Sequence, residues 1–389
     1  FFSTHTPPNE IPLRLVGSEM CIRDRILEMP VEIIGWVAPH ISSEIINPSG
    51  PYFDLKIIKK TAQVHEKGDF DTVLIGYFSD APDGAMIAAH ASSVTTKLRF
   101  LLAHRPGFVA PSLAARALAT LDQLSQGRLA VHIIAGGNDA DQAKDGDNST
   151  HSERYLRCTE YIKLMQLTWT KTEPFDFEGQ FYKTKGTQSH IQCVQKPHIP
   201  VYGGGGSDAA INSLAPYLDT FMLWGEPLKD TEDFMGRVRS KAKVNKNFLK
   251  FSLSTRPILA DTEKKAWQKA KTIHKKIMEL RGGSAAPRPS NVGSQRLLSV
   301  AAENEIHDTC LWTKLAVATG ARGNSTALVG TPDTVAKAMF EYYKIGATSL
   351  LIRGYDPLVD AEQYGKELIP KLRQMVKNYD TGYNARPTN

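Results

Sequence analysis

Short β-rich runs alternate with longer helical patterns from Val31 onward, and this alternation restricts the possible folds more than any other feature of the chain. Strands that alternate with helices predict parallel β-α-β units. About eight such units fit a closed barrel better than an open sheet. We therefore predict an α/β protein built on a TIM (β/α)8 barrel with insertions. The β-rich runs are 31–37, 72–75, 98–103, 128–135, 199–202, 220–223, 251–259, 326–329 and 349–352.

Two segments interrupt the alternation. Residues 175–192 have a hairpin-like pattern, and residues 281–324 begin Gly/Pro/Ser-rich and then contain a short helical patch near 295–303. A long irregular insertion inside a compact domain is usually an active-site lid or a disordered loop. We therefore expect insertions at about 174–195 and 281–324, the second of which forms a mobile lid loop.

The first residues differ from the rest of the chain. Residues 1–25 lack clear periodicity and 13–25 resemble translated sequencing-adaptor DNA, so we expect residues 1–28 to be non-native or disordered. A targeting arm is the alternative, although the segment lacks the apolar core of a signal peptide. Residues 29–380 are then expected to form a single barrel domain, followed by a C-terminal tail at 381–389.

Composition argues against several classes of function. The net charge is +6 over 389 residues, and the lysines and arginines are scattered between acids, which makes nucleic acid a poor partner. No apolar run is long enough to span a membrane. The four cysteines are far apart and have no metal-binding spacing, so we expect no metal and a reducing, cytoplasmic compartment.

The glycine run from Gly203 to Gly206, followed by Ser207, lies at a predicted strand-to-helix junction. Glycines let the backbone approach an anion closely, and the N–H groups and the dipole at a helix start attract it. The run matches neither a Walker loop, which needs Gly-Lys-Ser/Thr, nor the dinucleotide fingerprint, because Asp208 stands at the third glycine. We predict a phosphate-binding turn, and hence a phosphorylated cofactor or substrate. A flexible turn without a ligand is the alternative.

In a barrel of this kind, functional residues lie at the C-terminal ends of the strands. Some have structural alternatives: His40 and His104 could be hydrogen-bonded structural histidines. The chain has no nucleophile elbow, no His-Glu-x-x-His and no paired-cysteine site, so an organic cofactor with a phosphate is the natural carrier of the chemistry. The residues at the predicted strand ends are His40, Tyr77, His104, Arg105, Gly136, Gly203 to Ser207, Trp224, Glu226, Arg256 and Tyr355.

Several segments resemble the bacterial-luciferase-like flavin monooxygenases. Residues 114–128 (AARALATLDQLSQGR) are similar to the signature helix and turn of that superfamily. Residues 151–155 and 202–208 match its flavin-phosphate elements. The resemblance covers essentially residues 31–372, and it implies a TIM barrel that binds FMN.

Three further segments, 223–227, 326–330 and 354–355, are most similar to alkanesulfonate monooxygenase. The resemblance implies an enzyme that takes reduced FMN (FMNH2) from a separate NAD(P)H:FMN reductase and uses O2 to oxidise a small anionic organosulfur substrate. An alkanesulfonate would yield an aldehyde and sulfite. A homo-oligomer, either a dimer or a tetramer, is also expected.

The resemblance, together with the strand-end positions, predicts roles for individual residues. Arg322 matches the family's lid arginine, Tyr355 its active-site tyrosine and Trp224 a tryptophan of the substrate pocket. Arg256 is expected to join them as a catalytic residue that faces the flavin and binds a sulfonate or a developing oxyanion. The residues expected to bind FMN are Gly136, Tyr155, Gly203, Gly204, Gly205, Gly206 and Ser207. The residues expected to contact the substrate are His40, Tyr77, His104 and Arg105.

The sequence also departs from alkanesulfonate monooxygenase. Ser254 and Arg256 stand where that family has an arginine and a histidine, and residues 77–80 lack its active-site cysteine. The group that moves a proton and the exact substrate are therefore open. The alternatives are a deazaflavin (F420)-dependent dehydrogenase on the same barrel and a non-catalytic flavin-binding protein. An alternative for Arg256 itself is an ion pair with an acid at the barrel opening such as Glu226.

Overall fold

The computed structural model describes residues 31–384, apart from 243–248, 285, 288, 290 and 324. The segment 1–28, predicted to be non-native or disordered, lies outside the described residues, as do the last residues of the predicted tail. Helix α14 (Ile369–Asn384) continues past residue 380, where we expected the barrel domain to end.

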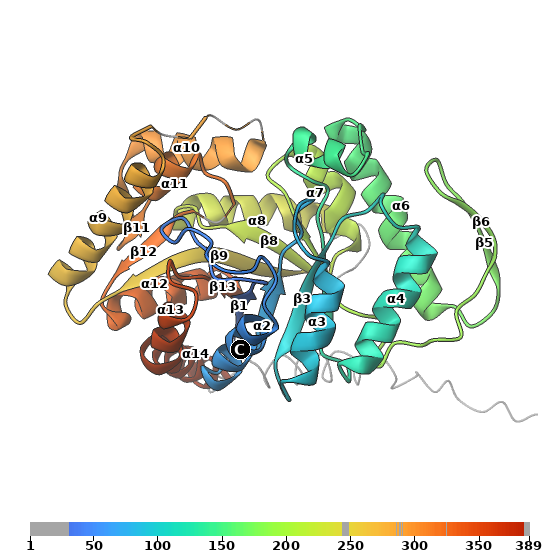
Figure 1. The fold of residues 1–389 in the computed structure, drawn as a ribbon, viewed down its shortest axis with the longest axis horizontal. Coiled ribbons are helices and arrows are strands. Elements are labelled where there is room, and N and C mark those ends of the chain that lie inside the picture. The colour runs from blue at the N-terminus through green and yellow to red at the C-terminus, as the bar shows by residue number, and fades with distance from the viewer. Residues whose placement is uncertain are drawn as a thin grey trace, which may run out of the picture.

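Among the described residues, eight parallel strands close into a barrel, which confirms the predicted TIM (β/α)8 fold (Figure 1). The order around the barrel is β1-β2-β3-β4-β7-β8-β9-β13, and β13 returns to pair with β1. The strand bounds are β1 (Glu32–Val37), β2 (Thr72–Ile75), β3 (Arg99–His104), β4 (Leu129–Ile133), β7 (Val201–Gly204), β8 (Thr220–Trp224), β9 (Lys250–Leu259) and β13 (Ser349–Ile352).

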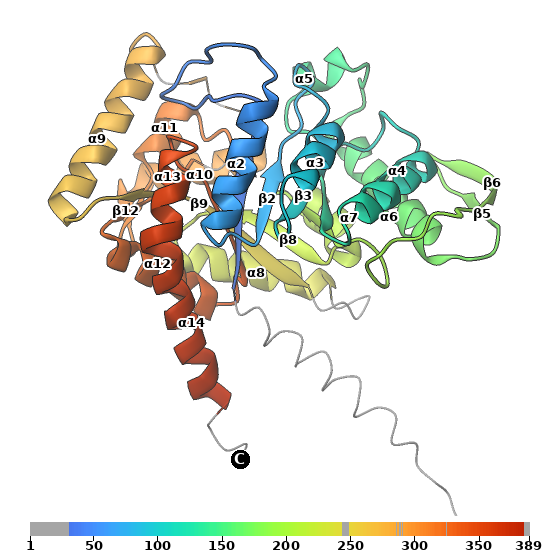
Figure 2. The same cartoon turned by 60° about the horizontal axis from the view of Figure 1, so that its bottom comes forward.

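Helices surround the barrel (Figure 2). They bury a large apolar cluster against the outward faces of its strands. A 3-10 turn (Ala215–Tyr217) follows α7, and a π-helical turn (Tyr364–Leu368) joins α13 to α14. No helix in the described part of the chain is both long and apolar enough to cross a bilayer. The remaining helix bounds are α2 (Leu55–Lys67), α3 (Gly84–Ser93), α4 (Pro111–Leu124), α5 (Asp139–Lys144), α6 (His151–Thr170), α7 (Asp208–Leu214), α8 (Leu228–Ala242), α9 (Glu263–Leu280), α10 (Val292–Glu303), α11 (Lys314–Thr319), α12 (Pro332–Lys344) and α13 (Val359–Gln363).

Local sequence sets several of the helix starts. Pro111 occupies the first turn of α4, where its missing N–H costs nothing. A capping box opens α6: the Thr150 hydroxyl accepts from the Glu153 N–H at 3.3 Å, and the Glu153 carboxylate accepts from the Thr150 N–H at 2.8 Å. Ser207 caps α7, and its hydroxyl accepts from the Ala210 N–H at 3.2 Å.

The interior of the barrel holds its own apolar cluster, separate from the one beneath the helices. The strands read as continuous apolar runs because both of their faces are buried. At the N-terminal end of the barrel the Glu32 carboxylate accepts from the Thr72 hydroxyl at 2.6 Å and from the Tyr202 hydroxyl at 3.1 Å. The interior cluster comprises Ile34, Leu74, Leu101, Ala130, Tyr202 and Leu351, with Trp36 and Met222 packed against it.

The structure of the first predicted insertion agrees with the sequence pattern better than that of the second. Strands β5 (Phe175–Glu178) and β6 (Lys183–Thr187) form the expected antiparallel hairpin, which projects away from the barrel (Figure 1). Residues 281–324 are more ordered than an irregular loop, because they contain α10, α11, β10 (Ile306–His307) and β11 (Leu311–Trp312). Two-residue strands and a six-residue helix are too short to produce a readable period.

Strand β9 is shared between the barrel and a small second sheet. Residues 250–255 pair with β8 and β13 inside the barrel, whereas residues 256–259 pair with β12 (Ala327–Gly330). Strand β12 pairs in turn with β11, and β11 pairs with β10. The His307 ring nitrogen Nε2 lies 3.0 Å from the Val300 carbonyl, which joins this sheet to α10.

Candidate functional site

The C-terminal ends of the barrel strands bring aromatic, basic and polar side chains to one opening, called here the barrel mouth. Side chains two positions apart in a strand point to the same side, so the residue two places after each interior apolar residue also faces inward. Gly76, at the end of β2, leaves space for an indole, because a Cβ there would lie 2.7 Å from Trp36. The inward-facing residues of the mouth identified in this way are Trp36, His132, Trp224 and Arg353.

Arg256 is the most heavily bonded side chain of the mouth. It is 1% exposed, and its two terminal nitrogens each donate to a carboxylate oxygen of Glu44 at 3.0 Å. Its Nε donates to the Arg353 carbonyl at 2.7 Å, and Nη2 also donates to the Gly354 carbonyl at 2.9 Å. The guanidinium carbon lies 3.9 Å from the centre of the Tyr355 ring. Arg256 thus forms a buried bidentate ion pair and ties β9 to the end of β13.

The acid that pairs with Arg256 is Glu44, in the loop after β1, so the expected alternative partner Glu226 is wrong. Glu226 instead forms an ion pair with Arg296 of α10, whose Nε donates to it at 2.9 Å. The reason is geometric: the end of β9 faces the β1–α2 loop, whereas the loop after β8 faces α10.

Glu44 accepts from a second arginine as well. Arg353 Nη2 lies 2.7 Å from Glu44 Oε1, and the Arg353 guanidinium lies 5.1 Å from the centre of the Trp36 ring. Burial alone would raise the pKa of Glu44, but the charges of both arginines outweigh it and hold the pKa well below its usual range. Burial and the neighbouring charge of Arg256 lower the pKa of Arg353.

Tyr355 lies beneath the Arg256 guanidinium and is 2% exposed. Its backbone N–H donates to Asp360 Oδ2 at 2.7 Å, which fixes the turn after β13. Burial raises the pKa of the Tyr355 hydroxyl to about 12, so this group is protonated near neutral pH. The structure therefore brings Tyr355 and Arg256 together, as the sequence led us to expect, and their catalytic roles stay predictions.

The glycine turn after β7 lies beside Tyr155 of α6. A Cβ on Gly205 would lie 2.7 Å from the Tyr155 hydroxyl oxygen. Within the described residues, that hydroxyl and the backbone N–H groups of Gly205, Gly206 and Ser207 make no hydrogen bond. Burial raises the pKa of Tyr155 to about 12, so the hydroxyl is a donor at neutral pH. The Tyr155 hydroxyl and the N–H groups of the adjacent turn are therefore neighbouring donors without acceptors among the described residues, which suits an anion with several oxygens.

The start of α10 covers this turn. A Cβ on Gly206 would lie 2.9 Å from the Gly293 nitrogen, and a Cβ on Gly293 would lie 2.9 Å from the Trp224 ring. The Ser294 hydroxyl donates to the Ala321 carbonyl at 2.6 Å, so the exposed Arg322 follows directly after a residue fixed to α10. The turn, Trp224 and the segment that carries Arg322 are therefore neighbours.

Two residues expected to bind substrate hold the loop after β4 in place. Arg105 donates to Asp141 Oδ2 at 2.7 Å and to the Ser79 hydroxyl at 2.8 Å, and its guanidinium lies 4.5 Å from the centre of the Tyr77 ring. The Tyr77 hydroxyl donates to Asp145 at 3.2 Å. Arg105 and Tyr77 thus clamp α5, and their predicted contact with a substrate stays a prediction.

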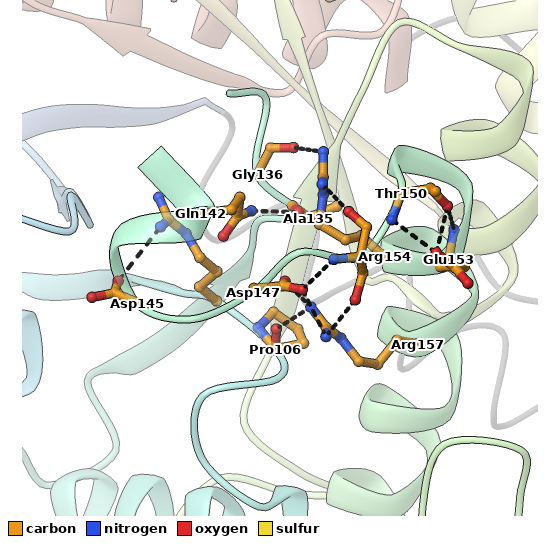
Figure 3. A network of polar contacts seen from close by, with 12 residues as sticks. Pro106, Ala135, Gly136, Gln142, Asp145, Asp147, Thr150, Glu153, Arg154 and Arg157 are labelled. Carbon is orange, nitrogen blue, oxygen red and sulfur yellow. Dashed lines mark hydrogen bonds and ion pairs between the residues drawn. The ribbon is translucent and has the colours of Figure 1, made fainter. Parts of the chain in front are cut away.

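Two arginines of α6 also hold this loop (Figure 3). Arg154 donates to the Ser149 carbonyl at 2.6 Å, and Arg157 pairs with Asp147 and donates to the Pro106 carbonyl at 3.2 Å. Gly136 has a φ of +84°, and a Cβ on it would overlap the Gln142 amide. Gly136 therefore has a sufficient structural reason to be glycine, whatever it binds.

The two histidines expected to bind substrate are in different surroundings. His104 alternates with the inward-facing Ala103, so it points to the helix layer, where its Nε2 lies 2.7 Å from the Tyr161 hydroxyl. Burial lowers the pKa of His104 to about 4. His40 lies in the loop after β1 with its ring centre 4.5 Å from that of Tyr52. The fold therefore separates His104 from the mouth.

Sequence reasoning missed Glu44, His132 and Arg353. His132 points into the barrel from β4, makes no hydrogen bond within the described residues, and has its pKa lowered to about 4 by burial. It is a neutral imidazole facing the mouth. The alternation of β13 could have identified Arg353, two places after the interior Leu351, whereas no local pattern marks Glu44. Among the described residues, no group of acidic, histidine and cysteine side chains could hold a metal ion.

Comparison with known proteins places these features in context. The family model for luciferase-like monooxygenases matches residues 32–349. The long-chain alkane monooxygenase LadA has a TM-score of 0.72 and 17% identity, with 89% of this chain and 91% of LadA covered. The EDTA monooxygenase EmoA from Chelativorans sp. BNC1 has a TM-score of 0.70 and 17% identity, covering 89% and 94%. Riboflavin lyase RcaE, solved with a modified FMN and riboflavin, has a TM-score of 0.70 and 18% identity, covering 89% and 92%. At these identities the likeness shows a shared fold.

Proposed function

Because the chain belongs to the luciferase-like monooxygenase family, we propose that it is a two-component enzyme that uses reduced FMN and O2 to oxidise a small organosulfur anion. The finer proposal is oxidative desulfonation of an alkanesulfonate to an aldehyde and sulfite. One observation carries the proposal: a turn with unpaired donors and a pair of arginines face each other across one barrel mouth. Strand β7 is four places from β1 around the barrel, so a ligand anchored at the turn extends toward Trp36.

The residues present fit an FMN phosphate at the glycine turn. The backbone N–H groups of Gly205, Gly206 and Ser207 and the Tyr155 hydroxyl would donate to its oxygens. Gly203 and Gly204 are needed for a different reason, because side chains there would meet Leu218 at 2.9 Å and the Met222 carbonyl at 2.4 Å. Substituting Gly204 would therefore damage the barrel itself, and Tyr155 offers the cleaner test.

Replacing Tyr155 with phenylalanine is expected to weaken FMN binding about tenfold, because a hydrogen bond to a charged group contributes about 1.5 kcal/mol. The dissociation constant can be measured by anaerobic titration with reduced FMN. Tyr182→Phe is a matched control, because the Tyr182 hydroxyl is also buried without a partner but lies in the β5–β6 hairpin. Equal affinities of the Tyr155 and Tyr182 variants for FMN would remove the phosphate assignment.

Reduced FMN, when bound, supplies the electrons for the reaction with O2. The protein's own residues would define the shape of the site around FMN and exclude water from it. Trp36 and Trp224 provide apolar walls, and Tyr355 keeps its proton at neutral pH because burial raises its pKa. His132 faces the same mouth and makes no hydrogen bond to the described residues, but burial lowers its pKa to about 4, so it is a neutral imidazole and a weak base at that pH.

Residues 281–324 are proposed to form a lid that carries Arg322 over the mouth and excludes water. The contacts of Gly293 with Gly206 and Trp224 support this proposal. FMN together with butanesulfonate is expected to slow trypsin cleavage after the exposed Arg281. Cleavage after Lys185 in the distant β5–β6 hairpin should not change, which controls for inhibition of trypsin. Identical cleavage rates after Arg281 with and without ligands would argue against closure.

A panel of sulfonates and sulfones, assayed with reduced FMN, tests the proposed function. The expected result is sulfite release that requires O2 and a supply of reduced flavin from an NAD(P)H:FMN reductase. A deazaflavin-dependent dehydrogenase would instead transfer hydride to or from F420 without O2. A non-catalytic flavin-binding protein would bind FMN and release no product. A cytoplasmic location and a homo-oligomeric state, either a dimer or a tetramer, are also part of the proposal. Light scattering tests the oligomeric state.

A further inference from the structure

Two arginines share one carboxylate at the barrel mouth. Glu44 accepts from Arg256 and from Arg353, and the three side chains together carry one excess positive charge. A guanidinium keeps its charge at any working pH. The excess charge cannot therefore be lost by deprotonation, and an added anion would balance it.

The two arginines differ in how many donors they have left. Arg256 uses its donors on Glu44 and on two backbone carbonyls, and it is 1% exposed. Arg353 makes one side-chain hydrogen bond within the described residues, from Nη2 to Glu44, and its side chain is 29% exposed. The Nε and Nη1 donors of Arg353 are therefore available to a ligand.

The surroundings of Arg353 restrict what such a ligand can be. The Trp36 ring lies against the guanidinium and forms an apolar wall. The Glu44 carboxylate lies beside the Arg353 guanidinium at Nη2. It would therefore repel a second negative group of a ligand whose first negative group is bound to Arg353. These surroundings thus suit a single oxyanion attached to an apolar chain, rather than a polyanion.

We propose that Arg353 and Trp36 form the subsite that binds the oxyanion head of the substrate, while Arg256 and Glu44 fix the orientation of Arg353. The ligand class is a small sulfonate, with a carboxylate as the competing oxyanion of similar shape. This inference rests on the proposed function for the identity of the substrate, but binding of the anion can be measured without turnover. Arg353 is thereby a specificity-determining residue, and Arg256 is a positioning residue.

Calorimetric titration of the purified protein with butanesulfonate, with and without FMN, tests the subsite. Arg353→Met is expected to weaken butanesulfonate binding about tenfold or more, since charge-assisted hydrogen bonds are lost. Arg353→Lys should restore part of the affinity, because it keeps the charge but not the planar fork. Arg239→Met is the matched control, because Arg239 also stacks on a ring, Phe251 at 4.9 Å, but lies on the outer layer. Butyrate and 1-butanol provide the carboxylate and the uncharged arms.

Unchanged butanesulfonate affinity in Arg353→Met, with a native melting curve, would overturn the subsite. So would equal binding of 1-butanol and butanesulfonate by the wild type. If Arg353→Met fails to fold, an unchanged dissociation constant of Arg353→Lys for butanesulfonate overturns the subsite in the same way. Butanesulfonate binding that depends on Arg353, without product from any sulfonate, supports the subsite and contradicts only the proposed reaction. A tighter complex with butyrate than with butanesulfonate would overturn the sulfonate class.

Discussion

Replacing Arg256 with methionine is expected to lower the free energy of unfolding by about 3–5 kcal/mol, the usual cost of removing one partner from a buried ion pair. Glu44 would lose two of its hydrogen bonds, and the carbonyls of Arg353 and Gly354 would lose their donor. An ammonium group cannot replace this fork, so Arg256→Lys should also lose stability. That outcome follows from the alternative that the sequence left open, an ion pair with an acid at the barrel opening, rather than from a role of Arg256 in binding the substrate. Urea unfolding followed by circular dichroism measures the change.

A double-mutant cycle identifies the partner. If Glu44 is the partner, combining Glu44→Leu with Arg256→Met should recover part of the loss, because no unpaired charge of this pair remains buried. Glu226→Leu should show no such coupling with Arg256→Met, since Glu226 pairs with Arg296. A loss below about 0.5 kcal/mol for Arg256→Met, the range of ordinary surface changes, would contradict a structural role for this arginine.

Acidification from pH 7 to pH 4 is expected to lower the free energy of unfolding by several kcal/mol. Burial lowers the pKa of His65, His104 and His132 to about 4 in the folded protein, from an ordinary value of 6.5. Below pH 6.5 the histidines of the unfolded chain therefore become protonated while those of the folded protein stay neutral. The free energy of unfolding decreases as the pH is lowered through this range. Each histidine contributes up to about 3 kcal/mol to this loss, which levels off below pH 4, where the folded protein is protonated too.

Urea unfolding at pH 7, 6 and 5 measures this dependence. His65→Gln should reduce it, because glutamine does not titrate. The same substitution at the exposed His190 should leave the slope as in the wild type. A free energy of unfolding that stays constant between pH 7 and 5 would show that the three rings take up protons as readily in the folded protein as in the unfolded chain, which contradicts this prediction.

Much of the barrel could be predicted from sequence because its signals are local. Pro111 and Thr150 mark helix starts, and strands buried on both faces read as short apolar runs. Helix α5 and the strands β10 and β11 were missed, since six or fewer residues carry no measurable period.

The site was predictable only in part, for a related reason. The glycine turn and Trp224 are visible in consecutive residues, and the structure places them together. The pairing of Arg256 with Glu44 joins positions 212 residues apart, and no pattern in one sequence indicates that contact. Glu226 was the more obvious acid because it follows the end of the neighbouring strand β8 by two residues. Closeness to a strand end along the chain does not determine which loop a side chain faces.

The division of β9 between two sheets limits how this enzyme can be recombined with its relatives. The segment 281–324 looks like an exchangeable loop in the sequence, yet its strands continue through β12 to the end of β9, directly after the barrel residue Thr255. In a chimera that replaced only residues 281–324, a foreign β11 would have to form its backbone hydrogen bonds with the native β12. The smallest unit that contains all four strands of the small sheet and keeps β9 whole runs from Lys250 to Gly330, and its barrel residues 250–255 must still pair with the native β8 and β13. Transplants between family members should therefore be cut before β9 and after β12.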